Sequence, residues 1–415
     1  MTNKPRQVSA GHTYWLGLIL LIAALCMPLC AWADSLETSI PQRKPQDSDY
    51  NQAVIDLQRS NLSAAEAGFQ RSFKKDPKDP YPLLGLAKIA LERKQMEEVG
   101  NYLQEAVATA PDDSNIQTTW GHYLFFRNRL PAAEAAYKKA IELSPTAFGP
   151  RLELADLYLT AMRRPQDAIA AYQGAAAEGC NTVHLHYMLA NAFFETGKTK
   201  NAEAEYEKAL HLQPESGMLY DALARTYVRE NERDKALQLY SAGYEVKPGE
   251  TSRPSPHLSQ AEAYFRVAMA EQSLKRLGAA EQDYHRAAEL DPKLAVAYNN
   301  FAFLAANQRI DLDEALRFAQ KATELDSKVP TFFDTLGWVY LARGQQEQAI
   351  ATLSKASSLL PHDPEVWYHL GVAYAEAHQT ADALRCLHQA LRISSVFPEA
   401  QEANLQVSRM EAKKK

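Results

Sequence analysis

One small residue recurs along most of this chain at a nearly constant interval, and this period constrains the fold more than any other feature. The intervals are 34 or 35 residues, with a single interval of 44. The column consists of Ala53, Ala87, Gly121, Ala155, Ala190, Ala224, Ala268, Ala302, Gly337 and Gly371. Such a period is typical of repeated helical hairpins, which cannot bury their apolar faces singly and therefore stack.

Other residue types keep the same phase. Small residues allow two helices to cross closely, and large residues fill the space between hairpins. Proline stops a helix because it lacks an amide proton. An aromatic column is formed by Tyr137, Tyr172, Tyr206, Tyr240 and Tyr284. Closing prolines stand at Pro77, Pro111, Pro145, Pro214, Pro248, Pro292 and Pro361.

The segment from Pro330 to Asp363 resembles the tetratricopeptide repeat (TPR) family most clearly. Leu336, Gly337 and Tyr340 match its first-helix pattern, and Gly344 matches its turn. The second-helix pattern is matched by Ala349, Leu353, Ala356 and Pro361. The resemblance covers about residues 46–397. It implies an all-α, right-handed superhelical solenoid of about ten helix–turn–helix repeats, with the first helices lining a concave groove.

The period divides the chain into six repeats over residues 46–250 and four over 261–397. Between them, residues 251–260 form an insertion that we expect to be an exposed loop or a lengthened helix start. It is either a contact loop or hinge, or a tolerated surface insertion, which we favour. Residues 398–415 should form a capping helix and a basic tail. Single extra residues near 163–165 and 309–313 should lie in inter-helix turns.

The N-terminus has the pattern of a secretory signal peptide over residues 1–33. Two basic residues precede an apolar run, which ends in Ala31-Trp32-Ala33. We expect cleavage between Ala33 and Asp34. The following polar segment, residues 34–45, is expected to be a disordered linker.

This pattern predicts export, and the repeats resemble those of exported bacterial TPR proteins, which points to the periplasm. The alternative is an uncleaved segment that anchors the protein to the inner membrane.

The groove-facing side chains follow from the small residue of each first helix, taken as a reference position. They form an aromatic and amide surface suited to a peptide or a helix of a partner protein. The predicted groove residues are His122, Phe125, Tyr187, Asn191, Phe194, Arg225, Phe265, Asn299, Phe303, Trp338 and Tyr368. The alternative is that several of these side chains only pack between neighbouring first helices.

No pattern in the sequence predicts catalysis. It contains no nucleophile elbow, phosphate loop or dinucleotide fingerprint, and we expect neither catalytic residues nor a cofactor. Cys180, His184 and His186 lie close together but lack the spacing of metal ligands. A net charge of −6 argues against nucleic-acid binding.

We therefore predict a non-enzymatic scaffold in the bacterial cell envelope that binds one or more proteins in its groove. The alternative is an accessory subunit of exopolysaccharide or cell-wall assembly or export machinery, because the repeats over Tyr298–Pro361 resemble those of TPR proteins in such systems. The membrane is a partner only if the signal segment is uncleaved.

Overall fold

A computed structural model describes Ile40 and residues 47–242 and 258–412. The described chain is all-helical, and its helices pair into ten successive hairpins followed by a single helix, α22. It divides into two compact units, which we treat separately: an N-terminal unit up to Gln213 and a C-terminal unit from Pro214. The predicted all-α repeat fold is confirmed.

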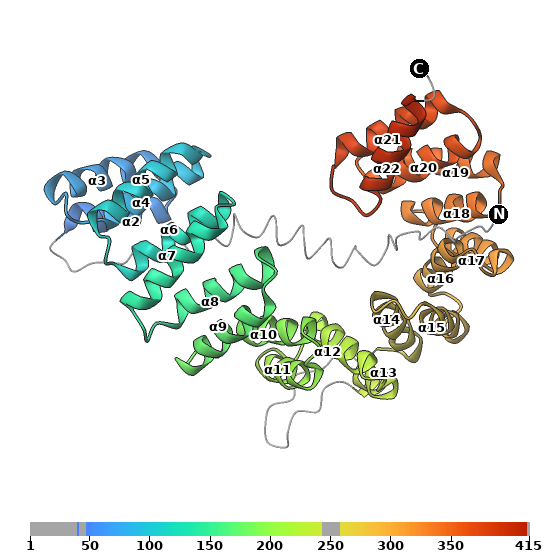
Figure 1. Ribbon diagram of the computed structural model, residues 1–415, viewed down its shortest axis with the longest axis horizontal. Helices are drawn as coiled ribbons and strands as arrows, with labels where there is room; N and C mark the ends of the chain where they lie inside the picture. Colours follow the sequence, from blue (N-terminus) through green and yellow to red (C-terminus); the bar gives the residue numbers. More distant parts are fainter. Residues whose placement is uncertain (1–39, 41–46, 243–257, 413–415) are drawn as a thin grey trace. The chain divides into compact units, whose positions relative to one another are not determined.

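The N-terminal unit holds five hairpins, coloured blue to green in Figure 1. Its helices are α2 (Ser48–Gln58), α3 (Leu62–Lys75), α4 (Tyr81–Glu92), α5 (Met96–Thr109), α6 (Ser114–Phe126), α7 (Leu130–Leu143), α8 (Phe148–Asp156), η2 (Leu157–Ala161), α9 (Pro165–Ala177), α10 (Val183–Glu195) and α11 (Thr199–Leu212). The first helix of each hairpin packs mainly against the second helix of the same hairpin.

The C-terminal unit holds the other five hairpins and α22. Its helices are α12 (Gly217–Arg229), α13 (Arg233–Ala242), α14 (Gln260–Ser273), α15 (Leu277–Leu290), α16 (Ala295–Gln308), α17 (Leu312–Leu325), α18 (Pro330–Ala342), α19 (Gln346–Leu359), α20 (Pro364–Glu376), α21 (Thr380–Ile393) and α22 (Ala400–Ala412). None of the described helices is both long and apolar enough to span a membrane.

The recurring small residue lies where the two helices of a hairpin cross. A Cβ atom on Gly121 would come within 2.6 Å of the Tyr137 ring, and one on Gly337 within 2.5 Å of Leu353. The alanines of the same column are completely buried. The crossing therefore admits at most a methyl group, as the sequence predicted.

The extra residue of the fourth repeat lies within a helix, so the prediction of a longer turn near residues 163–165 is wrong. It is absorbed by the π-helix η2, where the Met162 amide donates to the Leu157 carbonyl, five residues back, at 3.0 Å. The second extra residue does lie in a turn, where Arg309 and Asp311 both adopt left-handed backbone conformations.

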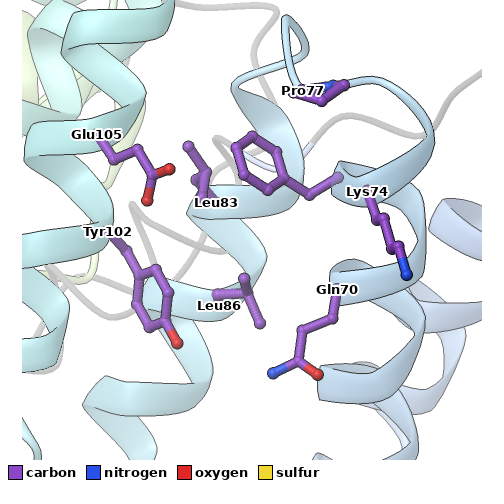
Figure 2. Close-up of a pocket in the computed structure, with 8 residues that line it drawn as sticks. Gln70, Lys74, Pro77, Leu83, Leu86, Tyr102 and Glu105 are labelled. Atoms are coloured by element: carbon purple, nitrogen blue, oxygen red, sulfur yellow. The ribbon is translucent and has the colours of Figure 1, made fainter.

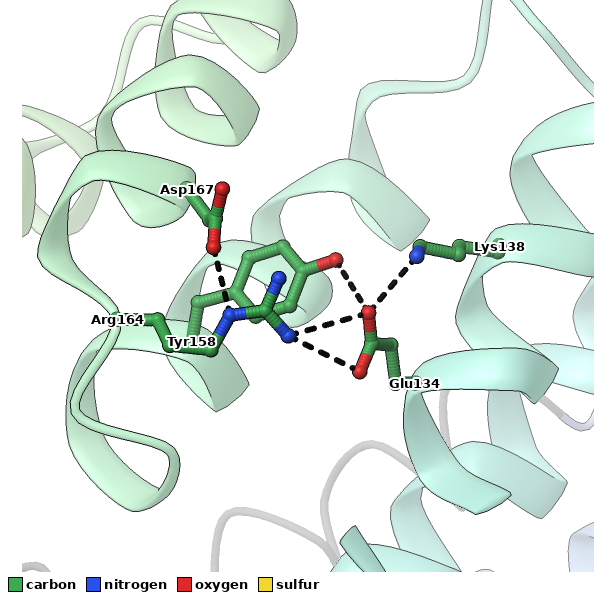
Figure 3. A network of polar contacts seen from close by, with 5 residues as sticks. All are labelled: Glu134, Lys138, Tyr158, Arg164 and Asp167. Atoms are coloured by element: carbon green, nitrogen blue, oxygen red, sulfur yellow. Dashed lines mark hydrogen bonds and ion pairs between the residues drawn. The ribbon is translucent and has the colours of Figure 1, made fainter. Parts of the chain in front are cut away.

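A network of polar side chains ties η2 to its neighbours (Figure 3). Tyr158 donates to Glu134 of α7 at 2.8 Å, and Lys138 donates to the same oxygen at 2.8 Å. The Arg164 guanidinium lies over the Tyr158 ring, 4.5 Å from its centroid, and donates to Asp167 at 2.6 Å. The widened helical turn is thus held from both α7 and α9.

The stack of hairpins continues across the predicted insertion, because α12 packs directly against α14. Arg233 of α13 donates to Asp283 of α15 at 2.9 Å. Arg276 donates to the carbonyl of Arg229 at 2.9 Å, which satisfies the C-terminal end of α12. These contacts hold α12 and α13 against α14 and α15 within the C-terminal unit.

The last residue of the predicted insertion, Gln260, begins α14. Ser259 caps this helix and exchanges hydrogen bonds with Glu262. Residues 251–257 lie outside the described residues.

Both ends of the stack are packed. The predicted capping helix is present as α22, and its Ala403 and Val407 are buried. The predicted linker holds one described residue, Ile40, which is buried in the same hydrophobic cluster as Tyr50. The rest of the predicted linker lies outside the described residues.

Substitution of Gly337 by valine should lower the free energy of unfolding by about 1–3 kcal/mol, because the added atoms would overlap Leu353. Chemical denaturation followed by circular dichroism measures the change. Gly278 of α15 is the matched control, because a Cβ atom there meets nothing within 4 Å. Equal effects of Gly337→Val and Gly278→Val would contradict the crossing argument.

Candidate binding surface

The predicted groove residues lie on one face of seven first helices, α6, α10, α12, α14, α16, α18 and α20. They stand three positions before, one position after or four positions after the small crossing residue, so they share one side of the helix. We call this side the first-helix face. In the N-terminal unit it includes His122 and Phe125 of α6 and Tyr187, Asn191 and Phe194 of α10, all half-buried.

The buried tyrosines of the second helices reach this face with their hydroxyl groups. Tyr206 donates to Asn191 at 2.6 Å, and Tyr240 donates to Asp221 at 2.7 Å. Tyr172 donates to Asp156 in the same way, and Tyr284 donates to Gln272 at 2.6 Å. These acceptors occupy the three positions that define the face.

Sequence reasoning missed this pairing, although the recurrence of an acceptor opposite each tyrosine was a usable signal. The exception is Tyr137, whose buried hydroxyl has no hydrogen-bond partner among the described residues.

Acid–base pairs link neighbouring first helices of the N-terminal unit. His122 of α6 lies 2.9 Å from Glu153 of α8, and His184 of α10 lies 2.9 Å from Asp156. Burial opposes ionisation of Glu153, but the charge and the hydrogen bond of His122, together with the charge of His184, lower the pKa of this carboxyl group. The hydrogen bond that Asp156 accepts from the His184 ring raises the pKa of His184. The face is therefore polar and ordered between its aromatic side chains.

Similar pairs connect first helices of the C-terminal unit. Asp221 of α12 lies 3.0 Å from Arg266 of α14, and Asp334 of α18 lies 2.9 Å from His369 of α20. In both pairs the acid stands three positions before its crossing residue, and the base two positions before the next one. Arg225 and Phe265, which we predicted for the groove, are half-buried nearby on α12 and α14.

Around the Asp334–His369 pair, the first helices fill their own face. The Trp338 ring lies 4.3 Å from the His369 ring, and the Phe303 ring lies 6.4 Å from it. Asn299, Phe303 and Tyr368 are only 5%, 2% and 7% exposed. For these three residues the structure favours the packing alternative over ligand contact. Trp338 remains half-buried and donates to Asn307 at 2.8 Å.

Two further buried carboxyl groups lie in this cluster. Glu365 is the second residue of α20, and Glu399 precedes α22; they are 5% and 9% exposed. Burial and the nearby Glu399 charge raise the pKa of Glu365 to about 8. Burial also raises the pKa of Glu399, whose Oε2 atom has no hydrogen-bond partner among the described residues. Burial alone would lower the pKa of His369, but Asp334 raises it to about 9.

The residues considered for a metal site each have other partners. His186 contacts Glu205 at 2.6 Å and Asn181 at 2.9 Å, whereas His184 contacts Asp156. Cys180 is buried with a free thiol. The described part of the chain contains no group of three metal-ligating side chains.

A separate apolar pocket of about 420 Å³ lies among α3, α4 and α5, away from the first-helix face (Figure 2). Leu83 and Leu86 of α4 line it together with Tyr102 of α5. Its charged lining residues, Lys74 and Glu105, have opposite signs, so charge does not select a ligand there.

The free energy of unfolding of the C-terminal unit should fall as the pH rises from 6 to 9. Because the pKa of His369 is raised in the folded state, this residue adds stability that is fully present below pH 6.5, its ordinary pKa. This stability is lost as the pH rises through about 9. The raised pKa of Glu365 acts in the same direction. Its contribution to stability is fully present below pH 4.5 and is lost as the pH rises through about 8. The charged groups facing them are Asp334, Asp363 and Glu399.

Denaturation at several pH values tests this expectation. Glu365→Gln should make the dependence on pH shallower, whereas the same change at exposed Glu347 should leave it as it is. A profile identical in Glu365→Gln and the unmodified protein would contradict the assignment.

Sequence profiles of known families match most of the chain. Profiles described as tetratricopeptide repeat match residues 56–119, 261–294 and 364–395. Another profile with this description matches the overlapping segments 118–182, 152–217 and 187–251. A profile described as TPR repeat matches residues 337–377.

Individual relatives are distant. The chain is 25% identical to the mitochondrial import receptor subunit TOM70 of Homo sapiens over 188 residues. This aligned region is 44% of this chain and 30% of that protein. It is 22% identical to the BBSome complex member BBS4 of Bos taurus, over 56% of this chain and 42% of that protein. The aligned regions thus span less than half the length of these relatives.

Among solved structures, one described as the functional characterization of Pseudomonas aeruginosa pilF is similar to this chain. The TM-score is 0.41 and the sequence identity is 16%. The match covers 53% of this chain and 95% of that one.

Proposed function

Because the chain belongs to the tetratricopeptide-repeat family, whose members are in general protein-interaction scaffolds, we propose that it is a non-enzymatic scaffold of the bacterial cell envelope. It binds a peptide or a helix of a partner protein on the first-helix face of its N-terminal unit. The observation that carries this proposal is the half-buried set of aromatic side chains on that face, formed by Phe125, Tyr187 and Phe194.

The chemistry of the N-terminal face suits a polypeptide. Half-buried aromatic rings offer apolar contact area and lose little conformational entropy on binding. Between them, the Asn191 side chain is held by the Tyr206 hydroxyl, so its amide group is already fixed in place for a hydrogen bond to a backbone group of a ligand. The C-terminal face has less free surface, because Asn299, Phe303 and Tyr368 are buried.

Tyr187→Ala and Phe194→Ala should each weaken binding of the partner by roughly 5- to 30-fold, as expected for aromatic hot spots. The partner is identified by crosslinking in cells, and its affinity is then measured by calorimetry. Tyr102→Ala is the matched control, because Tyr102 is also half-buried but lines the pocket among α3, α4 and α5. Equal affinities of Tyr187→Ala and the unmodified protein would exclude this face as the binding site.

The envelope location rests on the N-terminal pattern and on the resemblance of the repeats to exported bacterial TPR proteins. Ala33 and Asp34 lie outside the described residues. We expect the mature protein to begin at Asp34 and to appear in the periplasmic fraction. Fractionation followed by N-terminal sequencing measures both. A chain that keeps residues 1–33 and sediments with the inner membrane would support the anchored alternative.

The nature of the partner is a narrower proposal. Association with exopolysaccharide or cell-wall machinery rests on the resemblance of Tyr298–Pro361 to repeats in such systems. Loss of surface polymer on deletion of the gene, restored by the unmodified protein and not by Tyr187→Ala, would support it.

A further inference from the structure

A second pocket, of about 500 Å³, lies on the C-terminal unit between α20 and α21. Its lining residues are Trp367, Arg385, His388, Gln389 and Arg392. His388, Gln389 and Arg392 stand three, four and seven positions after Arg385, so the four residues share one side of α21. Trp367 stands four positions before Gly371, outside the positions that define the first-helix face. The pocket is therefore a surface separate from the proposed groove.

The Trp367 ring is held in place before any ligand arrives. Its Nε1–H group donates to the Pro361 carbonyl at 3.1 Å. One part of the side chain packs against the buried residues of the last two hairpins, and the rest lines the pocket. A fixed, partly open indole ring is a favourable anchor, because its large contact area is available at a small cost in conformational entropy.

The lining is basic and contains no acidic residue. Arg385 is paired with Asp382 at 2.8 Å, and His388 with Glu411 at 3.3 Å, but all four side chains are about half exposed or more. Exposed pairs of this kind contribute little and exchange readily. Arg392 donates to the neutral amide of Gln389 and has no acidic partner among the described residues. In a chain of net charge −6, this pocket is a local site for anions.

We propose that this pocket binds an acidic segment of a partner protein, with carboxylates on Arg385 and Arg392 and an apolar side chain against Trp367. The guanidinium fork matches a carboxylate with two parallel hydrogen bonds. Seven positions on α21 separate the two arginines by about 10 Å along the helix axis. Acidic residues three positions apart in a polyproline-II segment share one face and span about 9 Å, which is close to this distance.

The size of the pocket favours a peptide over a long anionic polysaccharide. About 500 Å³ accommodates one or two side chains, as in sites that enclose most of their ligand. A polysaccharide chain would need an extended basic track, and the basic lining residues here are confined to one helix.

A fluorescein-labelled, end-capped peptide that carries two glutamates three positions apart, with leucine between them, tests the proposal by fluorescence anisotropy on the full chain. The Arg385→Gln/Arg392→Gln double variant should weaken its binding about 10-fold or more, since charge-assisted hydrogen bonds are lost. Trp367→Leu should also weaken binding. Added salt should reduce the affinity of the unmodified protein, because the arginines are exposed.

The matched control is Arg286→Gln/Arg317→Gln, which removes the same charge from exposed arginines on α15 and α17. It should change the affinity less than 2-fold, and circular dichroism confirms that all variants are folded. The Tyr187→Ala variant should bind this peptide as the unmodified protein does, because Tyr187 lies on the first-helix face and not in this pocket. The pocket and the first-helix face are therefore tested independently of each other.

Three results would overturn the proposal. The first is equal binding of a peptide with glutamine in place of glutamate. The second is unchanged binding by the Arg385→Gln/Arg392→Gln variant. The third is binding of a uronic-acid oligosaccharide without binding of the peptide, which would assign the pocket to a polysaccharide instead.

Discussion

The close crossing of the two helices in each hairpin is the constraint on which the rest of the structure depends. At Gly121 and Gly337, a single added carbon would lie within 2.6 Å of the opposing side chain. This approach brings Tyr172, Tyr206, Tyr240 and Tyr284 under their first helices, so that each hydroxyl reaches an acceptor on the first-helix face. The same contact therefore packs the core and sets the rotation of the first helix, which decides which side chains form the first-helix face.

The tyrosine hydroxyls couple the core to this surface. A buried hydroxyl requires a partner, because an unsatisfied polar group costs about 1–3 kcal/mol. Asp156, Asn191, Asp221 and Gln272 supply that partner from the face itself. Part of the polarity of the face is thus required by the fold, and it would persist with no ligand. The aromatic residues between these acceptors have no such structural requirement, which is why they carry the functional proposal.

The two compact units use the same face differently. In the C-terminal unit, α12 and α14, and likewise α16 and α18, lie closer together than neighbouring first helices of the N-terminal unit. Phe303 and Asn299 are consequently enclosed, and the Asp334–His369 pair is almost completely buried. A buried ion pair adds little net stability, but loss of one partner leaves an uncompensated charge. This pair therefore enforces one packing of α18 against α20.

The sequence by itself determined the hairpins, their number and the side of each first helix that forms the first-helix face, because these follow from a period of 34 residues and the volume available at each crossing. Only the tertiary structure decided which residues on that side remain accessible. Phe303 and Phe125 both occupy it, yet only Phe303 is buried, because burial depends on the distance to the next first helix. The tertiary structure also turned one extra residue into η2 and brought Glu365 near Glu399. Spacing along a chain fixes the direction of a side chain, whereas its environment depends on neighbours that the spacing does not specify.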